Sequence, residues 1–232
     1  MGWTLSSVLR VGVLVSGAGT TLQALIDACA DDGFPARVVL VVSNTPGAFA
    51  LERAQRAGIP AVVIDHRAHA SPASFESALR QVLDAARVDL VCLAGFLRIL
   101  SPTFVEAFAG RMMNIHPALL PAFGGKGMYG DRVHAAVLRS GCRVTGCTVH
   151  FVTAVPDGGP IIAQVAVPVL DDDAVADVAA RVHREELRLY PLVMRLFAEG
   201  RLRIEGNRVR TLPAGAEAYG DASCAEGASR RG

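Results

Sequence analysis

The sequence predicts an α/β fold, with a doubly wound, mostly parallel sheet and helices on both faces. The first observation is a series of short, nearly continuous apolar segments, which is typical of strands buried on both faces; these segments are residues 11–15, 38–42, 61–64 and 89–94. The second is that segments with helical periodicity lie between them, and strand–helix alternation favours a parallel sheet. The third is size, because 232 residues, 51% apolar and 19% charged, suffice for one large domain with a buried core.

Local signals place the helices of the first half. Apolar residues recur at i, i+3, i+4 and i+7 over residues 22–29, directly after the first strand, and again over residues 75–83. Ser101-Pro102 predicts a further helix start, with serine as the N-cap and proline in the first helical position.

The second half predicts a fifth strand over residues 112–116, a glycine-rich stretch over 124–130 and a short helix over 133–139. Two strands follow, 146–152 and 161–169, on either side of the turn 156–159. A long helix is expected over 174–199, interrupted or kinked near Pro191, and then a small hairpin over 201–209. We therefore expect one domain over residues 8–209 and a largely disordered tail over 210–232, which is rich in Ala, Gly and Ser.

Charge and cysteine content exclude several classes of function. The 23 basic and 22 acidic residues give a net charge of +1, which predicts no surface for nucleic acid or membranes. The five cysteines are odd in number and lack CxxC spacing, so we expect buried, reduced thiols rather than disulfides or a zinc cluster. With no signal peptide and no apolar run of about 18 residues, we expect a cytoplasmic protein.

The turn after the first strand, residues 16–21, is a candidate anion site. Gly17 and Gly19 allow an anion to approach the backbone, the start of the next helix offers unpaired N–H groups, and Thr20 and Thr21 add hydroxyls. Leu22 stands where a dinucleotide-binding turn needs a third glycine, which disfavours NAD. A glycine turn of this kind is often purely structural, and both interpretations stay open.

Asn114 and His116 are candidate catalytic residues at the end of the fifth strand. Residues at i and i+2 of a strand point to the same face, so an amide and an imidazole lie side by side. Pro117 favours extended geometry at His116. Open α/β sheets bind ligands at the carboxyl ends of their strands, although a histidine there is often only a satisfied polar group.

Two carboxylates are harder to interpret. Asp157 precedes Gly158, which is ordinary turn chemistry, and its distance from His116 cannot be read from the sequence. Glu186 falls on the apolar stripe of the long predicted helix, where a carboxylate needs a partner. It could form an internal salt bridge or receive a substrate ammonium or hydroxyl.

Together these residues resemble the phosphoribosylglycinamide formyltransferase family, over about residues 11–209. The most specific stretches are LAGFLRILSP at 93–102, MNIHPALLP at 113–121, VHFV at 149–152 and DGGPIIAQ at 157–164. Agreement by chance over blocks of this length in this order is negligible.

The resemblance implies a transfer of the formyl group from 10-formyltetrahydrofolate to glycinamide ribonucleotide, in purine synthesis and without a metal. It implies that Asn114, His116 and Asp157 are catalytic. The substrate phosphate would bind at Gly19, Thr20 and Thr21, and Glu186 would contact the glycinamide part. The folate site would contain Leu97, Arg98, Ile99, Leu100 and Asn114, with Val152 near the pterin. Leu120-Pro121 is expected to be a cis peptide.

Three positions depart from the family pattern. Thr20-Thr21 replaces serine and asparagine, residues 71–73 replace a loop arginine of the folate site, and Leu187 replaces a histidine after the helix glutamate. None of these touches the catalytic residues. The stretch 124–127 lacks the GK[ST] order of a P-loop and is interpreted as a mobile flap.

Alternative functions remain. A 10-formyltetrahydrofolate hydrolase would share the three catalytic residues but is expected to carry an additional N-terminal domain. A methionyl-tRNA formyltransferase is expected to carry a basic C-terminal domain. A non-catalytic ligand-binding protein of the same fold is disfavoured by the intact Asn114, His116 and Asp157. A homodimer is an assembly state that the sequence leaves open.

Overall fold

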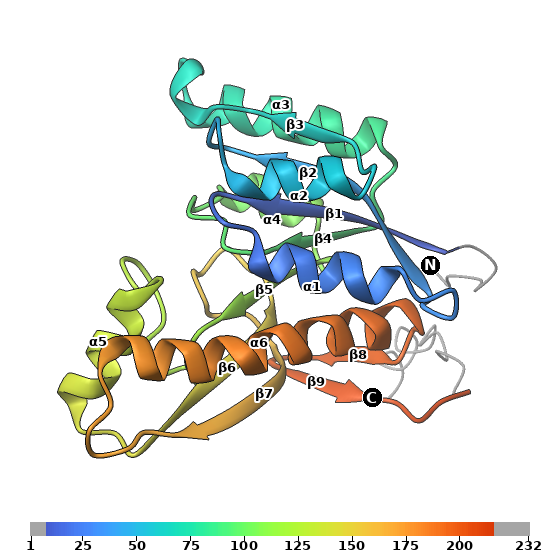
Figure 1. Cartoon of the computed structure of the whole chain (residues 1–232). Coiled ribbons are helices and arrows are strands. Elements are labelled where there is room, and N and C mark those ends of the chain that lie inside the picture. The colour runs from blue at the N-terminus through green and yellow to red at the C-terminus, as the bar shows by residue number, and fades with distance from the viewer. Residues whose placement is uncertain (1–7, 216–232) are drawn as a thin grey trace, which may run out of the picture.

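In the computed structural model, which describes residues 8–215, the chain forms one sheet with the strand order β3-β2-β1-β4-β5-β6-β7-β9-β8 (Figure 1). The first five strands in this order are mutually parallel. They are β3 (Ala61–Val63), β2 (Ala36–Ser43), β1 (Leu9–Val15), β4 (Leu90–Leu93) and β5 (Met112–His116). Their apolar, β-branched sequences suit strands covered on both faces, which confirms the expected α/β class.

The remaining strands change direction. β6 (Val144–Phe151) pairs antiparallel with β5, and β7 (Ile161–Pro168) pairs antiparallel with β6. A hairpin of β8 (Leu202–Glu205) and β9 (Arg208–Thr211) then extends the sheet, with β9 parallel to β7. The sheet is therefore mixed, with its antiparallel part confined to the second half of the chain.

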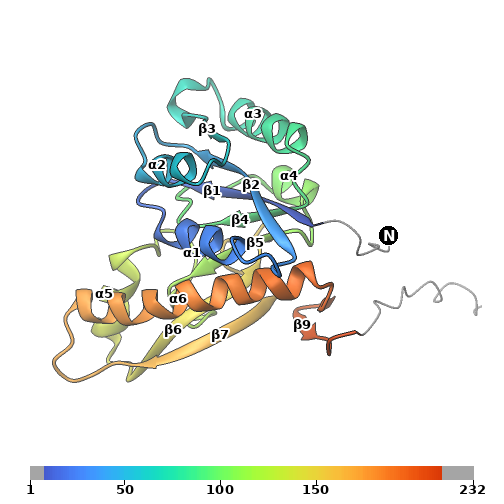
Figure 2. The same cartoon turned by 45° about the vertical axis from the view of Figure 1, so that its right-hand side comes forward.

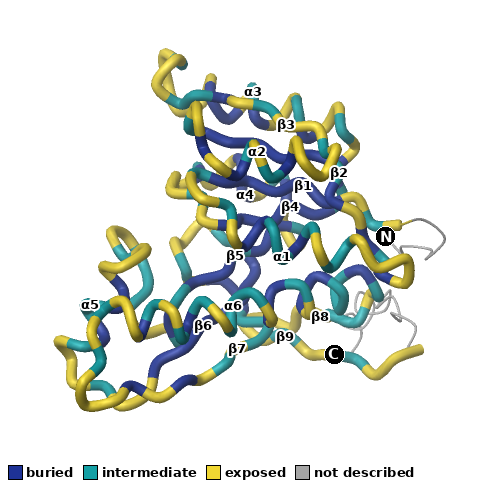
Figure 3. The backbone as a smooth tube through the Cα atoms, in the orientation of Figure 1, coloured by how far each residue is buried: buried dark blue, intermediate teal, exposed yellow. Residues whose placement is uncertain are grey.

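Helices cover both faces of the sheet (Figures 1 and 2). One face packs against α1 (Thr20–Cys29), α2 (Phe49–Arg56), α5 (Asp131–Ser140) and the long α6 (Val175–Ala198), which together enclose the larger apolar core. The other face packs against α3 (Pro72–Ala85) and α4 (Pro102–Ala107) around a second core. A single 3-10 turn, η1 (His66–Ala68), leads into α3. The central strands form the most deeply buried part of the chain, and the exposed backbone lies mainly in the loops and outer helix faces (Figure 3).

Most predicted elements are confirmed, with four differences. The helix α2 is not among the predictions, because only two alanines, Ala50 and Ala54, are buried on it. The expected interruption at Pro191 is wrong: α6 runs unbroken through it, held by buried neighbours such as Tyr190. The hairpin continues to Thr211, two residues beyond the predicted domain end, and the predicted tail from residue 216 lies outside the described residues.

The fourth difference concerns the thiols. Cys92 and Cys147 are buried as expected, whereas Cys29 and Cys142 are only partly buried and Cys224 lies outside the described residues. The cis peptide expected at Leu120-Pro121 is present.

The chain order switches between β1 and β4. Strands β2 and β3 extend from one side of β1, and β4 and β5 from the other, so the loops that leave β1 and β4 diverge at their carboxyl ends. Such a switch point opens a crevice for a ligand. In Figure 1, β1 begins near the N-terminus on the right, and its carboxyl end lies on the left.

Candidate active site

A cavity of about 650 Å³ opens at the carboxyl ends of β4 and β5. This volume lies within the usual range for small-molecule sites, roughly 300–1,000 Å³. Its walls contain most of the residues singled out in the sequence, namely Thr21, Leu97, Arg98, Ile99, Leu100, Asn114, His116, Val152, Asp157 and Glu186. Gly19 and Thr20 are not in its lining and lie beside it at the start of α1.

Strand β5 supplies Asn114 and His116, two residues apart and on one face. His116 is 3% exposed, and both of its ring nitrogens face oxygen acceptors. Nε2 lies 2.8 Å from the Phe123 carbonyl oxygen, and Nδ1 lies 3.5 Å from Asp157 Oδ2. One ring nitrogen thus faces a backbone carbonyl and the other a carboxylate.

Asp157 reaches this pair from the loop between β6 and β7. Its backbone has a φ of 55°, in the left-handed region that aspartate tolerates better than most residues. Oδ2 also accepts the Gly125 N–H at 2.8 Å, and Oδ1 lies 3.6 Å from His150 Nε2. Burial alone would raise the pKa of Asp157, but its hydrogen bond with His150, the charge of His116 and the Gly125 N–H together lower it. The side chain is therefore an ionised carboxylate in a largely buried position.

His150 is a site residue that was not predicted from the sequence. It lies on β6 directly opposite Asn114 in the antiparallel pair, and its Nε2 is 3.2 Å from Asn114 Nδ2. A histidine in an otherwise apolar strand was the available signal, but the register that places it against Asn114 depends on tertiary pairing. Asn114 and His116 are thus each held by a protein partner in this structure.

Glu186 faces the cavity rather than the core, at the α6 end of its wall. Its Oε2 lies 2.8 Å from Nδ1 of His183, one turn earlier on the same helix. The hydrogen bond to Glu186 raises the pKa of His183, although partial burial opposes it. The partner that a carboxylate on this stripe requires is therefore His183, which was not predicted from the sequence.

The turn before α1 has the geometry expected of an anion site. Gly19 has a φ of 71°, and no side chain caps the helix, so its first N–H groups are free of side-chain acceptors. A Cβ at Gly19 would lie 2.6 Å from the Cβ of Ala50, so this glycine also permits close contact with α2. Arg53 of α2 donates from Nε to the Ala18 carbonyl at 2.9 Å, which places a cation beside the turn.

The loop after β4 forms the apolar wall. Leu97 and Ile99 are 59% and 62% exposed, and because both line the cavity they give its wall an open apolar surface. His134 of α5 lines the same cavity and is 5% exposed, and burial lowers its pKa. These features suit a ligand with a flat apolar ring and polar substituents.

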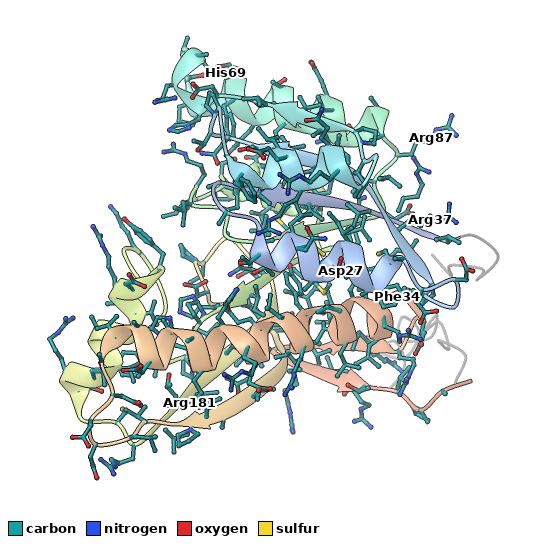
Figure 4. The ribbon with its side chains drawn as sticks, in the orientation of Figure 1. Asp27, Phe34, Arg37, His69, Arg87 and Arg181 are labelled. Carbon is teal, nitrogen blue, oxygen red and sulfur yellow. The ribbon has the colours of Figure 1, made fainter. Side chains whose placement is uncertain are left out.

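Within residues 8–215, no group of three or more His, Cys, Asp or Glu side chains is placed to hold a metal ion. His69, labelled in Figure 4, lies just before the start of α3. No helix in the described range is both long and apolar enough to span a bilayer.

Comparison with known proteins agrees with this geometry. Residues 9–194 match the family described as Formyl transferase. The chain is 44% identical over 199 residues to phosphoribosylglycinamide formyltransferase of Escherichia coli (strain K12), covering 86% of this chain and 92% of that protein. It is 47% identical over 196 residues to the trifunctional purine biosynthetic protein adenosine-3 of Gallus gallus, covering 84% of this chain. It spans only 19% of that longer relative.

A solved structure, glycinamide ribonucleotide transformylase 1 from Symbiobacterium toebii, superposes with a TM-score of 0.84 at 50% identity. The match covers 89% of this chain and 95% of that one. Identity of this size over nearly the whole of a single-domain relative is shared ancestry rather than a shared fold alone. The chain therefore belongs to the phosphoribosylglycinamide formyltransferase family of formyl transferases.

Proposed function

We propose that this protein transfers the formyl group of 10-formyltetrahydrofolate to the amine of glycinamide ribonucleotide. The observation that carries the proposal is the meeting of Asn114, His116 and Asp157 on the wall of one cavity, which also contains the apolar loop 97–100 and Glu186. The names of the relatives support transfer of a formyl group to glycinamide ribonucleotide, and the exposed apolar loop 97–100 supports folate as the donor.

The cavity offers a separate place for each substrate. The folate ring would lie against the exposed Leu97 and Ile99, with Val152 beneath it. The ribonucleotide phosphate would bind the uncapped start of α1, where helix N–H groups and Arg53 favour an anion. Glu186 would receive the glycinamide part from the opposite wall. The two reactants then meet at Asn114 and His116.

The reaction forms a bond between the amine nitrogen and the formyl carbon and breaks the bond from that carbon to the folate nitrogen. Negative charge develops on the formyl oxygen, so fixed donors stabilise the transition state. Asn114 Nδ2 has two protons, and only one is needed for its contact with His150. His116 would turn its Nε2 proton from the Phe123 carbonyl to the formyl oxygen.

Asp157 completes the mechanism as the ionised partner of the His116 ring. Its carboxylate lies against Nδ1 and is itself fixed by the Gly125 N–H. The proton lost by the attacking amine passes to the departing folate nitrogen, with Asp157 and His116 as the ionisable groups beside that path.

A single assay tests the function. Purified protein is given 10-formyltetrahydrofolate with and without glycinamide ribonucleotide, and deformylated folate is followed over time. The proposal requires release that depends on the ribonucleotide and yields an equal amount of formylated product. Release at the same rate without the ribonucleotide would instead indicate a hydrolase, and no release would indicate a non-catalytic binding protein. The cytoplasmic location and homodimer remain predictions.

A further inference from the structure

Ser16 opens the turn between β1 and α1, yet its side chain contacts a different loop. Its Oγ accepts the backbone N–H of Leu97 at 2.8 Å, across 81 residues of sequence. The same oxygen lies 2.6 Å from Asn44 Oδ1, at the end of β2. One hydroxyl therefore joins the carboxyl ends of β1, β2 and β4 at the switch point of the sheet.

Chemistry fixes the direction of these bonds. The Leu97 N–H can only donate, so Ser16 Oγ accepts it and the hydroxyl proton is left for Asn44. Asn44 is 3% exposed, and its Nδ2 lies 3.2 Å from His66 Nδ1. That nitrogen is also 3.2 Å from the Asn44 carbonyl oxygen, so either ring tautomer keeps a hydrogen bond to Asn44. The Ser16 hydroxyl and the Asn44 side chain therefore each have a hydrogen-bond partner for their donors and acceptors.

The loop that receives this bond is otherwise supported by side-chain packing, since Leu100 is buried in the second core and Phe96 packs against it, whereas its backbone has few partners. Before it, Ala94 N–H bonds to the Leu14 carbonyl at 2.9 Å. After it, the N–H of Ser101 bonds to Glu76 Oε1 at 2.7 Å. Between these anchors, the Leu97 N–H is the only backbone group of residues 95–100 that bonds to protein within the described range. At the exposed Leu97 and Ile99, the backbone is therefore held by the Ser16 hydroxyl, while Phe96 and Leu100 hold the loop by packing.

We propose that Ser16 is a positioning residue for the formyl donor, although it belongs to the turn that serves the ribonucleotide. The backbone of the turn binds the phosphate, whereas the Ser16 hydroxyl holds the apolar folate loop in its binding position. The inference rests on the proposed function, because it assigns the loop 97–100 to the donor. It predicts that the two substrates respond differently to loss of one hydroxyl.

The test is steady-state kinetics of Ser16→Ala with both substrates varied. The donor KM should rise roughly five- to tenfold, because the N–H of Leu97 loses the acceptor that holds the loop in place. The ribonucleotide KM and kcat should stay within about twofold of the wild type, since a hydroxyl that touches neither substrate adds little else to either. A merely structural role would lower the melting temperature and leave the donor KM unchanged.

Ser140→Ala is the matched control. The Ser140 hydroxyl also accepts a backbone N–H, from Cys142 at 3.3 Å, and donates to an oxygen, the Val137 carbonyl at 2.6 Å. It ends α5 and does not line the cavity. Ser140→Ala deletes the same hydroxyl group as Ser16→Ala but outside the cavity, so the donor KM should equal that of the wild type.

A second variant separates loss of the hydrogen bond from misfolding of the alanine variant. Ser16→Cys keeps a weak hydrogen-bonding group of similar size and should give a donor KM between those of wild type and alanine. Equal increases in both KM values, or an unchanged donor KM in a folded Ser16 variant, would overturn the inference. A wild type without ribonucleotide-dependent transfer would overturn the proposed function instead, which separates the two failures.

Discussion

Replacing Asp157 with asparagine removes one charge from the site and little else. Asparagine also tolerates the φ of 55° found here, and its remaining oxygen can still accept the Gly125 N–H. The lost charge lies 3.5 Å from His116 Nδ1. With an effective dielectric constant of about 20, Coulomb's law gives about 5 kcal/mol for such a pair as an upper limit. Solvent and relaxation reduce this, and opposite charges this close typically displace a titration by about one to three pH units.

The expected consequence is a large fall in turnover near neutral pH. The Asp157 carboxylate favours positive charge on the imidazole ring beside it, so its loss should lower kcat about 10- to 100-fold. Both KM values should change by less than about threefold, because the contact acts mainly in the transition state.

The assay is kcat against pH, from about pH 5 to pH 9. Because the net effect of its surroundings lowers the pKa of Asp157, the wild-type carboxylate stays ionised through this window and loses its charge only as pH falls below its usual range. The alkaline limb of the variant should move to lower pH by about one to two pH units. Asp171→Asn, which removes an exposed aspartate paired with Arg143, should leave the profile unchanged. An Asp157→Asn profile that coincides with the wild type would refute the charge argument.

Three further substitutions separate function from stability. Glu186→Gln should raise the ribonucleotide KM about tenfold, because an amide cannot balance an ammonium. Since Glu186 raises the pKa of His183, the pair stabilises the fold at acidic pH, and the melting temperature of Glu186→Gln should fall by about 1–3 °C near pH 5.5 and not near pH 8.5. Gly17→Ala should raise the ribonucleotide KM without loss of stability, because a Cβ there meets no heavy atom within 4 Å. Gly19→Ala should also lower the free energy of unfolding in urea, by about 1–3 kcal/mol, since its left-handed φ and the contact with Ala50 both oppose a side chain.

Local sequence patterns predicted most of the fold because each element has a strong signal of its own. Strand β5 has the predicted bounds, and α6 differs from its prediction by one residue at each end. The helix α2 lacked such a signal, because its buried residues are two small alanines, and of its two large apolar residues Phe49 is exposed and Leu51 only half-buried. At Pro191 the sequence predicted a helix break that is not present, since the tertiary packing of α6 outweighs one missing hydrogen bond.

The site was predictable only to the extent that single segments define it. Asn114 and His116 could be paired by the two-residue period of a strand. Asp157 could be linked to them only through family resemblance, because 41 residues of chain separate it from His116 and no local rule fixes its direction. His150 and His183 were not predicted as site residues. Each is identified by the side chain that it contacts, Asn114 for His150 and Glu186 for His183. These contacts depend on strand register and helix orientation, which are tertiary properties.

The antiparallel pairing of β5 with β6 makes the chemistry of the site sensitive to the register of these two strands. Asn114 opposes His150 across that pairing, and the loop that leaves β6 delivers Asp157. A slip of one residue would turn every side chain of β6 to the opposite face, removing His150 from Asn114 while leaving the parallel half of the sheet unchanged. A chain in which β6 pairs out of register would therefore keep its parallel strands and lose the arrangement of Asn114, His150 and Asp157 on which the proposed chemistry depends.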